Sequence, residues 1–115
     1  MGILSQLFGS QSAKTEVVDV AEAHRRQKAG AVLIDVREPD EWRAGHAPRA
    51  TLVPLGKLPA RLAELPRDRE ILLICRSGNR SGQAQRWLRQ QGFGNTFNVV
   101  GGMNDWQRAD LPVER

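Results

Sequence analysis

Two short runs of consecutive apolar residues constrain the fold of this chain more than any other feature. Residues 31–36 read AVLIDV and residues 70–74 read EILLI. A strand with one face in water alternates apolar and polar residues, whereas short uninterrupted runs of this kind are typical of strands buried on both faces of a parallel sheet. The sequence therefore predicts two buried parallel strands with helices on either side of them.

The segments around these runs alternate between strand and helix patterns. Shorter strands are predicted over residues 15–18, 51–53 and 96–100, and helices over residues 20–29, 39–44, 58–65 and 83–91, followed by a brief segment with Met103 and Trp106. Asp19 is a typical helix N-cap, and Gly30 stands where glycine commonly ends a helix. This alternation predicts an α/β fold with a small open, mostly parallel sheet and helices on both faces.

A single domain is expected over residues 15–113, and residues 1–14 are interpreted as an N-terminal tail or a short helix. The chain has 115 residues, close to the commonest domain size. No apolar stretch approaches the roughly 18 residues that a membrane span needs. The first residues lack the basic segment of a secretory signal, so we expect a cytoplasmic protein.

The net charge is positive, but the basic residues are scattered along the chain. Lysine and arginine number 17 against 13 acidic residues, which gives a formal charge of +4. No basic block is interleaved with aromatic residues, so a nucleic-acid partner is not expected. Most basic side chains are interpreted as a solvated surface, and Arg76 and Arg80 are treated as exceptions because of the residues around them.

Cys75 is the only cysteine of the chain. A lone cysteine forms no intramolecular disulfide, and His24 and His46 do not stand at ligand spacing with it for a tetrahedral zinc site. No metal or organic cofactor is therefore expected. If Cys75 is reactive, any group that it accepts must leave to an external acceptor.

The residues after Cys75 favour an anion-binding nucleophile. They read CRSGNRS, and they follow a predicted buried strand at the edge where open α/β sheets bind ligands. Backbone N–H groups of such a loop and the start of the next helix attract negative charge, and Gly78 permits a tight curl. A free thiol is only about 3% thiolate at neutral pH, and lowering its pKa by roughly two makes thiolate the main form.

The candidate site follows from this loop. Cys75 is the predicted catalytic residue, and the predicted substrate-binding residues are Arg76, Ser77, Gly78, Asn79, Arg80 and Ser81. The alternative is a cysteine that acts as a small buried apolar residue at the end of a strand. That alternative is disfavoured because the following residues are unsuited to a core and well suited to holding an anion.

Three motifs resemble those of the rhodanese-like family. The loop CRSGNRS at residues 75–81 is similar to the family's active-site loop. Residues 35–42 (DVREPDEW) with 45–48 (GHAP) resemble its N-terminal signature, and residues 101–106 (GGMNDW) resemble its C-terminal one. The motifs cover the chain from about residue 17 to residue 111. Arg49 stands where the family usually has glycine, so this departure concerns a local turn and not the chemistry.

The resemblance implies a five-stranded parallel sheet and a single-domain thiosulfate sulfurtransferase. Cys75 would carry a sulfane sulfur as a persulfide, with the loop amides from Arg76 to Arg80 around the outer sulfur. The sulfur would come from a small anionic donor such as thiosulfate and leave to a thiophilic acceptor, either cyanide or a thiol. Asp35 and Arg37 are expected to support the loop structurally.

Two other functions stay open at this point. A persulfide carrier would relay sulfur to a specific protein partner, and it needs the same Cys75 and loop. A cysteine phosphatase or arsenate reductase is less expected. Four residues separate Cys75 from Arg80, where related phosphatases have five, so the loop suits a sulfur atom better than a phosphate. A single cysteine also cannot close the internal disulfide of a reductase.

Overall fold

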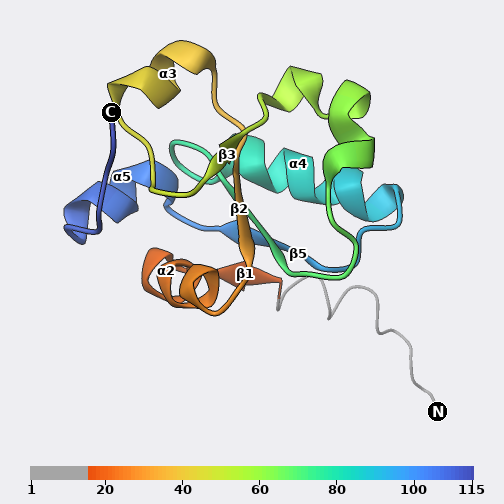
Figure 1. Cartoon of the computed structure of the whole chain (residues 1–115), viewed down its shortest axis with the longest axis horizontal. Coiled ribbons are helices and arrows are strands. Elements are labelled where there is room, and N and C mark those ends of the chain that lie inside the picture. Colours follow the sequence, from red (N-terminus) through yellow and green to blue (C-terminus); the bar gives the residue numbers. More distant parts are fainter. Residues whose placement is uncertain (1–15) are drawn as a thin grey trace.

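The structure is a computed structural model that describes residues 16–115. Five strands form one open sheet in the order β1-β5-β4-β2-β3. Their bounds are β1 Val17–Val18, β2 Val32–Asp35, β3 Thr51–Leu52, β4 Ile71–Ile74 and β5 Thr96–Val99. All four neighbouring pairs are parallel (Figure 1), which confirms the predicted α/β sheet. The predicted tail or short helix at residues 1–14 lies outside the described residues.

The two apolar runs occupy the middle of this sheet. β4 is the central strand, and its Leu72 is in register with Leu33 of β2 and with Phe97 of β5. All four residues of β4 are buried, and β2 is buried from Leu33 to Asp35. Because successive side chains point to opposite faces of a strand, both faces of β4 and β2 need apolar cover. This requirement explains why their sequences do not alternate.

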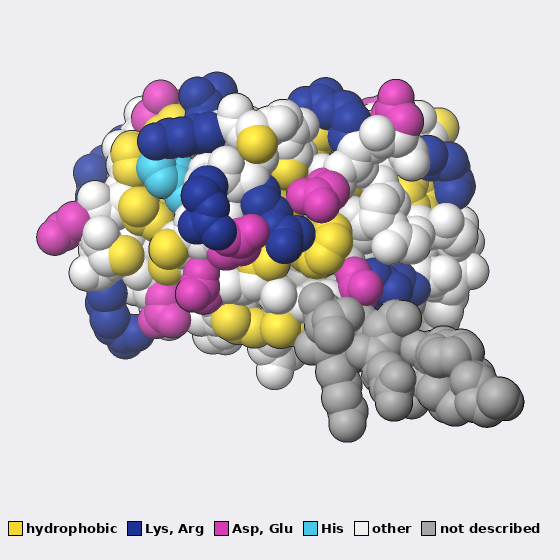
Figure 2. All heavy atoms as spheres, turned by 90° about the horizontal axis from the view of Figure 1, so that it is seen from below, with side chains coloured by type: hydrophobic (Ala, Val, Ile, Leu, Met, Phe, Trp, Pro, Cys, Tyr) yellow, Lys and Arg dark blue, Asp and Glu magenta, His cyan; other side chains and the backbone are white. Residues whose placement is uncertain are grey.

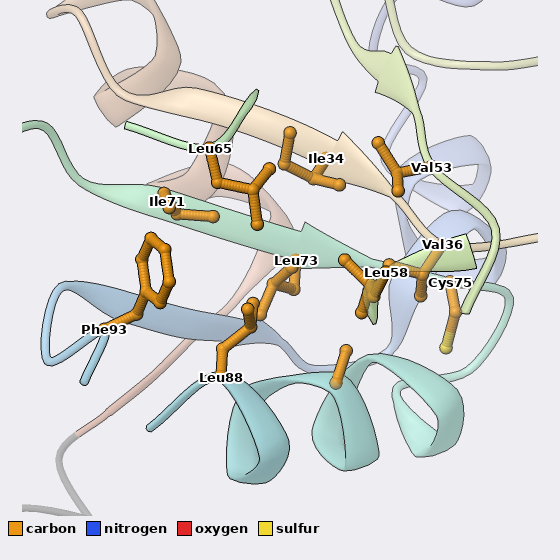
Figure 3. Packing of buried hydrophobic residues seen from close by; sticks show 11 residues of the cluster. Ile34, Val36, Val53, Leu58, Leu65, Ile71, Leu73, Cys75, Leu88 and Phe93 are labelled. Atoms are coloured by element: carbon orange, nitrogen blue, oxygen red, sulfur yellow. The ribbon is translucent and has the colours of Figure 1, made fainter. Parts of the chain in front are cut away.

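Helices cover both faces of the sheet. Their bounds are α2 Val20–Lys28, α3 Pro39–Ala44, α4 Asn79–Gln90 and α5 Gly102–Arg108. Side chains of α2 and α5 pack with Leu72 and Ile74 in one cluster, whereas α4 packs with Ile71 and Leu73 in the other. Figure 3 shows the second cluster between β4 and α4. The short segment expected around Met103 is thus a complete helix, α5.

Helix α4 begins earlier than the sequence predicts. The expected helix covers residues 83–91, whereas the observed helix is Asn79–Gln90. Gly78 adopts a left-handed conformation with φ 106°, and it turns the chain from the loop directly into the helix. The prediction was wrong because the polar residues 79–81 were assigned to the loop. They form the first turn of α4, so only residues 76–78 separate Cys75 from the helix.

The segment predicted as a helix over residues 58–65 consists of 3-10 turns. Two short 3-10 helices, Leu55–Lys57 and Pro59–Glu64, replace the expected α-helix. Pro59 stands at the start of the second helix, where its missing N–H is tolerated, but Arg61 departs from helical geometry with φ −114° and ψ 15°. An α-helical hydrogen-bond ladder therefore does not form, although Leu58 still packs into the core cluster with α4.

Arg49 occupies a left-handed turn. Its φ is 63°, a conformation that costs a non-glycine residue about 1 kcal/mol or more. The neighbouring Pro48 carbonyl accepts a hydrogen bond from Gln27 of α2 at 2.8 Å. The turn thus keeps the conformation that glycine favours even though the residue is arginine, and the departure stays local.

The described surface carries charges of both signs. Figure 2 shows one face of the molecule, on which basic and acidic side chains are interspersed and do not form one continuous basic area. Among residues 16–115, no helix combines the length and the apolar character that a bilayer crossing requires.

Candidate active site

Cys75 lies at the carboxyl end of the central strand, directly after β4. Its side chain is buried and belongs to the core cluster that also contains Val36 and Leu58. Figure 3 shows the sulfur beyond the end of β4, directed toward the first turn of α4. The cysteine therefore lies at the edge where parallel α/β sheets present their ligand-binding groups.

The loop after Cys75 folds its donors onto the sulfur. The backbone N–H groups of Gly78 and Ser81 donate to Sγ at 3.1 and 3.4 Å, and the Ser81 hydroxyl lies 3.2 Å from the same atom. Ser81 is in the first turn of α4, so its N–H group has no partner within the helix and is free to donate to the sulfur. A side chain at Gly78 would come within 3.4 Å of the Gly101 backbone nitrogen. That distance is an ordinary van der Waals contact, so glycine is favoured here by its φ of 106° and not by a lack of space.

These contacts favour the thiolate form of Cys75. Burial acts to raise the pKa of the thiol, because the anion loses water. Hydrogen bonds from the Ser81 side chain and from the amides of Ser81, Gly78 and Ser77 act in the opposite direction and prevail, so the pKa of Cys75 lies below its ordinary value. The thiolate is the nucleophilic form of cysteine, so the site is arranged for attack by sulfur.

Arg80 extends from the first turn of α4 to α3. Its two terminal nitrogens lie 2.8 and 2.9 Å from the carboxylate oxygens of Glu41, in a bidentate ion pair. The hydrogen bonds from Arg80 outweigh burial and lower the pKa of Glu41 to about 2. The loop motif predicts Arg80 as a substrate-binding residue and gives no indication of Glu41. No spacing pattern links the two residues, which are 39 positions apart.

The other predicted loop residues differ in their surroundings. Arg76 and Ser77 are exposed. Within residues 16–115 no salt bridge engages Arg76. Asn79 accepts a hydrogen bond from Gln83 at 2.9 Å along the surface of α4. Gly78 and Ser81 are thus in contact with the sulfur, whereas Arg76 presents a guanidinium to solvent.

A cleft of about 350 Å³ opens beside the loop. Its lining comes from the end of β2, from α3, from the loop and from α5, and comprises Arg37, Asp40, Glu41, Ala44, Gly45, Arg76, Met103, Asn104 and Gln107. Both signs of charge are present in this lining. Arg76 connects the cleft to the loop that holds Cys75.

Asp35 and Arg37 form a buried ion pair near the cleft. The Arg37 Nη2 atom lies 2.8 Å from Asp35 Oδ2. The same nitrogen donates to the carbonyl oxygen of Gly45 at 2.8 Å. The pair therefore joins the end of β2 to the residue that follows α3.

Helix α5 holds the backbone of the loop. The N–H groups of Met103 and Asn104 donate to the carbonyl oxygens of Cys75 and Arg76 at 2.8 and 3.0 Å. A Cβ atom at Gly102 would lie only 2.4 Å from the Cys75 carbonyl oxygen. Close packing of α5 on the loop therefore requires glycine at this position.

Asn98 belongs to the site although the sequence analysis did not identify it. Its Oδ1 accepts from the Ser81 hydroxyl at 2.6 Å, and its Nδ2 donates to the Gly78 carbonyl oxygen at 3.2 Å. It thereby links the two residues whose amides contact Sγ. The available signal was a polar side chain at the third position of β5, between Phe97 and Val99.

Comparisons with known proteins bear on this site. A family model described as Rhodanese-like domain matches residues 19–109. A sulfurtransferase of Allochromatium vinosum is 43% identical over 82 residues, which are 71% of this chain and 77% of that protein. YrkF of Bacillus subtilis, whose name proposes a sulfur carrier, is 45% identical over 74 residues, which are 64% of this chain and 40% of YrkF.

Solved structures have the same fold. The crystal structure of a rhodanese-related protein from Thermoplasma volcanium superposes with a TM-score of 0.80 and 32% identity, covering 86% of this chain and 97% of that one. The matched span of residues 19–109 contains Cys75 and its loop. Sulfur transfer is therefore the general chemistry of the chain, which belongs to the rhodanese-like domain family, as its three motifs predicted.

Proposed function

We propose that this protein is a thiosulfate sulfurtransferase in which Cys75 carries the transferred sulfur as a persulfide. The observation that supports this most directly is the pair of amide donors at 3.1 and 3.4 Å from the buried Sγ atom. Donors fixed in a site of low water content stabilise developing negative charge more strongly than water does. They would act on the attacking thiolate and on the persulfide anion alike.

The proposed reaction has two steps. In the first, the Cys75 thiolate attacks the outer sulfur of thiosulfate, a new S–S bond forms, and the old S–S bond breaks as sulfite leaves with its electron pair. In the second, a cyanide ion or an acceptor thiolate attacks the outer sulfur of the persulfide. Thiocyanate or a new persulfide leaves, and the Cys75 thiolate is regenerated. This is a double displacement with a covalent enzyme intermediate.

The arginines of the loop have different parts in this proposal. Arg76 is exposed and lines the cleft, so its guanidinium is placed to bind the sulfonate oxygens of the donor. Arg80 uses two of its five N–H groups on Glu41. It holds the loop against α3, and its other three N–H groups are left to bind the oxygens of the sulfur donor. Asn79 and Ser77 complete the exposed rim.

A persulfide carrier that serves a protein acceptor is the second candidate. The resemblance to YrkF, whose name proposes a sulfur carrier, favours it. The same Cys75 chemistry underlies both functions, and only the acceptor differs. Turnover with small acceptors distinguishes them, because a dedicated carrier transfers its sulfur slowly unless its partner is present.

The test is intact-mass analysis of the reduced protein after incubation with thiosulfate. We expect a gain of one sulfur atom, about 32 Da, as a persulfide on Cys75. Addition of cyanide should remove that mass and release thiocyanate. Cys75→Ser is the matched control, since it keeps the side chain small and polar but has no thiolate to attack sulfur.

Three results would change the assignment. Sulfur uptake by the Cys75→Ser variant would refute Cys75 as the acceptor. Uptake without release to cyanide or thiols would favour the carrier. No uptake by a folded, reduced protein, together with hydrolysis of phosphate esters, would replace sulfur transfer from thiosulfate with a phosphatase activity.

A further inference from the structure

The Ser81 hydroxyl lies between two groups but has only one proton. Its Oγ atom is 2.6 Å from Asn98 Oδ1 and 3.2 Å from Cys75 Sγ. The amide oxygen of Asn98 only accepts, so the hydroxyl proton is donated to Asn98 at this short distance. The Ser81 oxygen then faces the thiol with a lone pair, and the Cys75 S–H donates to it.

The orientation of the Asn98 carboxamide is fixed by the loop. Its Nδ2 donates to the Gly78 carbonyl oxygen at 3.2 Å. Rotation of the carboxamide by a half turn would place its oxygen against that carbonyl, so the hydrogen-bond network assigns the orientation. A Cβ atom at Gly82 would lie 3.3 Å from Asn98 Nδ2, so the glycine in α4 leaves room for the contact.

We propose that Asn98 is a positioning residue for the reacting sulfur: it accepts the hydrogen bond of the Ser81 hydroxyl while Cys75 is a thiol, and it loses that hydrogen bond to the sulfur when the sulfur becomes an anion. The inference rests on the proposed function, because the anion is the attacking thiolate. When the thiol loses its proton to solvent, Sγ changes from a donor to an acceptor. The Ser81 hydroxyl rotates about its Cβ–Oγ bond, leaves Asn98 and donates to Sγ, and Ser81 keeps its proton throughout.

Asn98 therefore competes with the sulfur anion for one hydrogen bond. Without the competitor, the Ser81 hydroxyl is free to serve the thiolate. Asn98→Ala should lower the pH midpoint of thiolate formation by about half a pH unit to one unit, the equivalent of one neutral hydrogen bond. The charged groups on the elements around Cys75 are unchanged in this variant. They are Asp35 of β2, Arg37 after it, Glu38, Asp40, Glu41 and Arg43 at α3, Arg76 of the loop, Arg80, Arg86 and Arg89 of α4, and Asp105 and Arg108 of α5.

Alkylation of Cys75 by iodoacetamide over a range of pH measures the thiolate directly. The chain has no other cysteine, so intact mass reports this residue alone. The rates are compared in the wild type, Asn98→Ala, Ser81→Ala and the double variant. We expect Asn98→Ala to lower the midpoint in the wild-type background and to leave it unmoved in the Ser81→Ala background, where no hydroxyl is left to compete for.

Two results overturn the inference. An equal change of midpoint in both backgrounds would mean that Asn98 acts through the shape of the loop and not through the Ser81 proton. A midpoint that stays constant or rises in the wild-type background would mean that no competition exists. Alkylation needs no sulfur donor, so failure of thiosulfate to load Cys75 refutes the proposed donor and leaves this titration test valid.

Two further variants control for folding. Asn98→Val removes the carboxamide but keeps a residue that favours strands, and it replaces Asn98→Ala if the alanine variant is poorly folded by circular dichroism. Asn95→Ala makes the same truncation just before β5, where the side chain donates to the carbonyl oxygens of Pro66 and Arg69. Asn98→Val should lower the midpoint as Asn98→Ala does, and Asn95→Ala should leave it at the wild-type value.

Discussion

Glu41→Gln tests whether the ion pair with Arg80 stabilises the loop that holds the sulfur. The two side chains join α3 to the first turn of α4 through contacts of 2.8 and 2.9 Å. Glutamine has nearly the same shape as glutamate, so the substitution removes the charge and leaves one acceptor oxygen. We expect the variant to fold, with a lower free energy of unfolding at neutral pH.

The size of this loss follows from the pKa of Glu41. Lowering that pKa from its usual 4.5 to about 2 corresponds to roughly 3 kcal/mol for a pair shielded from water. The Glu41 and Arg80 side chains are 25% and 32% exposed, so solvent screens their attraction. We therefore expect Glu41→Gln to reduce the free energy of unfolding by about 1 kcal/mol at pH 7.

The loss should depend on pH with a defined sign. The pKa of Glu41 is lower in the folded than in the unfolded chain, so its contribution is complete above about pH 4.5 and disappears as the pH falls toward 2. Urea unfolding followed by tryptophan fluorescence measures both proteins at pH 7 and at pH 3. The difference between them should be smaller at pH 3.

The matched control is Glu64→Gln, which removes the surface pair with Arg61. Glu64 is 59% exposed, and pairs of this kind contribute little. A Glu41→Gln variant as stable as the wild type at pH 7 would refute the reasoning. So would a loss of equal size at both pH values, because the charge would then not be its cause.

Three more substitutions test other parts of the structure. Gly102→Ala should lower the free energy of unfolding by about 3 kcal/mol in urea titrations and weaken sulfur uptake. The new Cβ would lie 2.4 Å from the Cys75 carbonyl oxygen, and the residue would have to keep a left-handed conformation. Near-wild-type stability would contradict the close packing. Arg49→Gly should raise the free energy of unfolding by up to about 1 kcal/mol, since φ is 63° at this position. A destabilised variant would show that contacts of the Arg49 side chain outweigh the cost of its backbone conformation. Arg76→Gln should raise the KM for thiosulfate about tenfold with little change in kcat. The control Arg86→Gln, which changes an exposed arginine of α4, should change neither constant. Equal KM values in both variants would show that Arg76 does not bind the sulfur donor.

The fold could be predicted because strands that are buried on both faces have a recognisable run of apolar residues. A strand covered on both faces has no polar side to alternate with, and β4 is buried at every position. The start of α4 could not be predicted from propensity, because Asn79 and Ser81 favour turns as much as a first helical turn. Their state depends on the left-handed Gly78 before them. The spacing of Leu58, Leu62 and Leu65 fits an α-helix equally well, so it did not reveal that residues 59–64 form a 3-10 helix with a non-helical Arg61.

The site could be predicted only as far as it is local. Cys75, Gly78 and Ser81 lie within seven consecutive residues, so a single loop motif indicates their arrangement. Asn98 is 17 positions from Ser81, and the contact exists only because β5 lies beside β4 in the sheet. The substrate roles of the loop residues, the bounds 15–113 and the cytoplasmic location stay predictions.

The charges around Cys75 also bear on which substrate the site suits. Arg37 and Arg80 are both paired with carboxylates, those of Asp35 and Glu41. Arg80 therefore keeps three of its five N–H groups for an anionic ligand, and Arg76 has no salt bridge among residues 16–115. The sulfur itself is held by neutral N–H donors at 3.1 and 3.4 Å. These N–H groups act on the Cys75 sulfur itself, where the thiolate and the proposed persulfide both carry one negative charge, and the arginines remain for the oxygens of the sulfur donor.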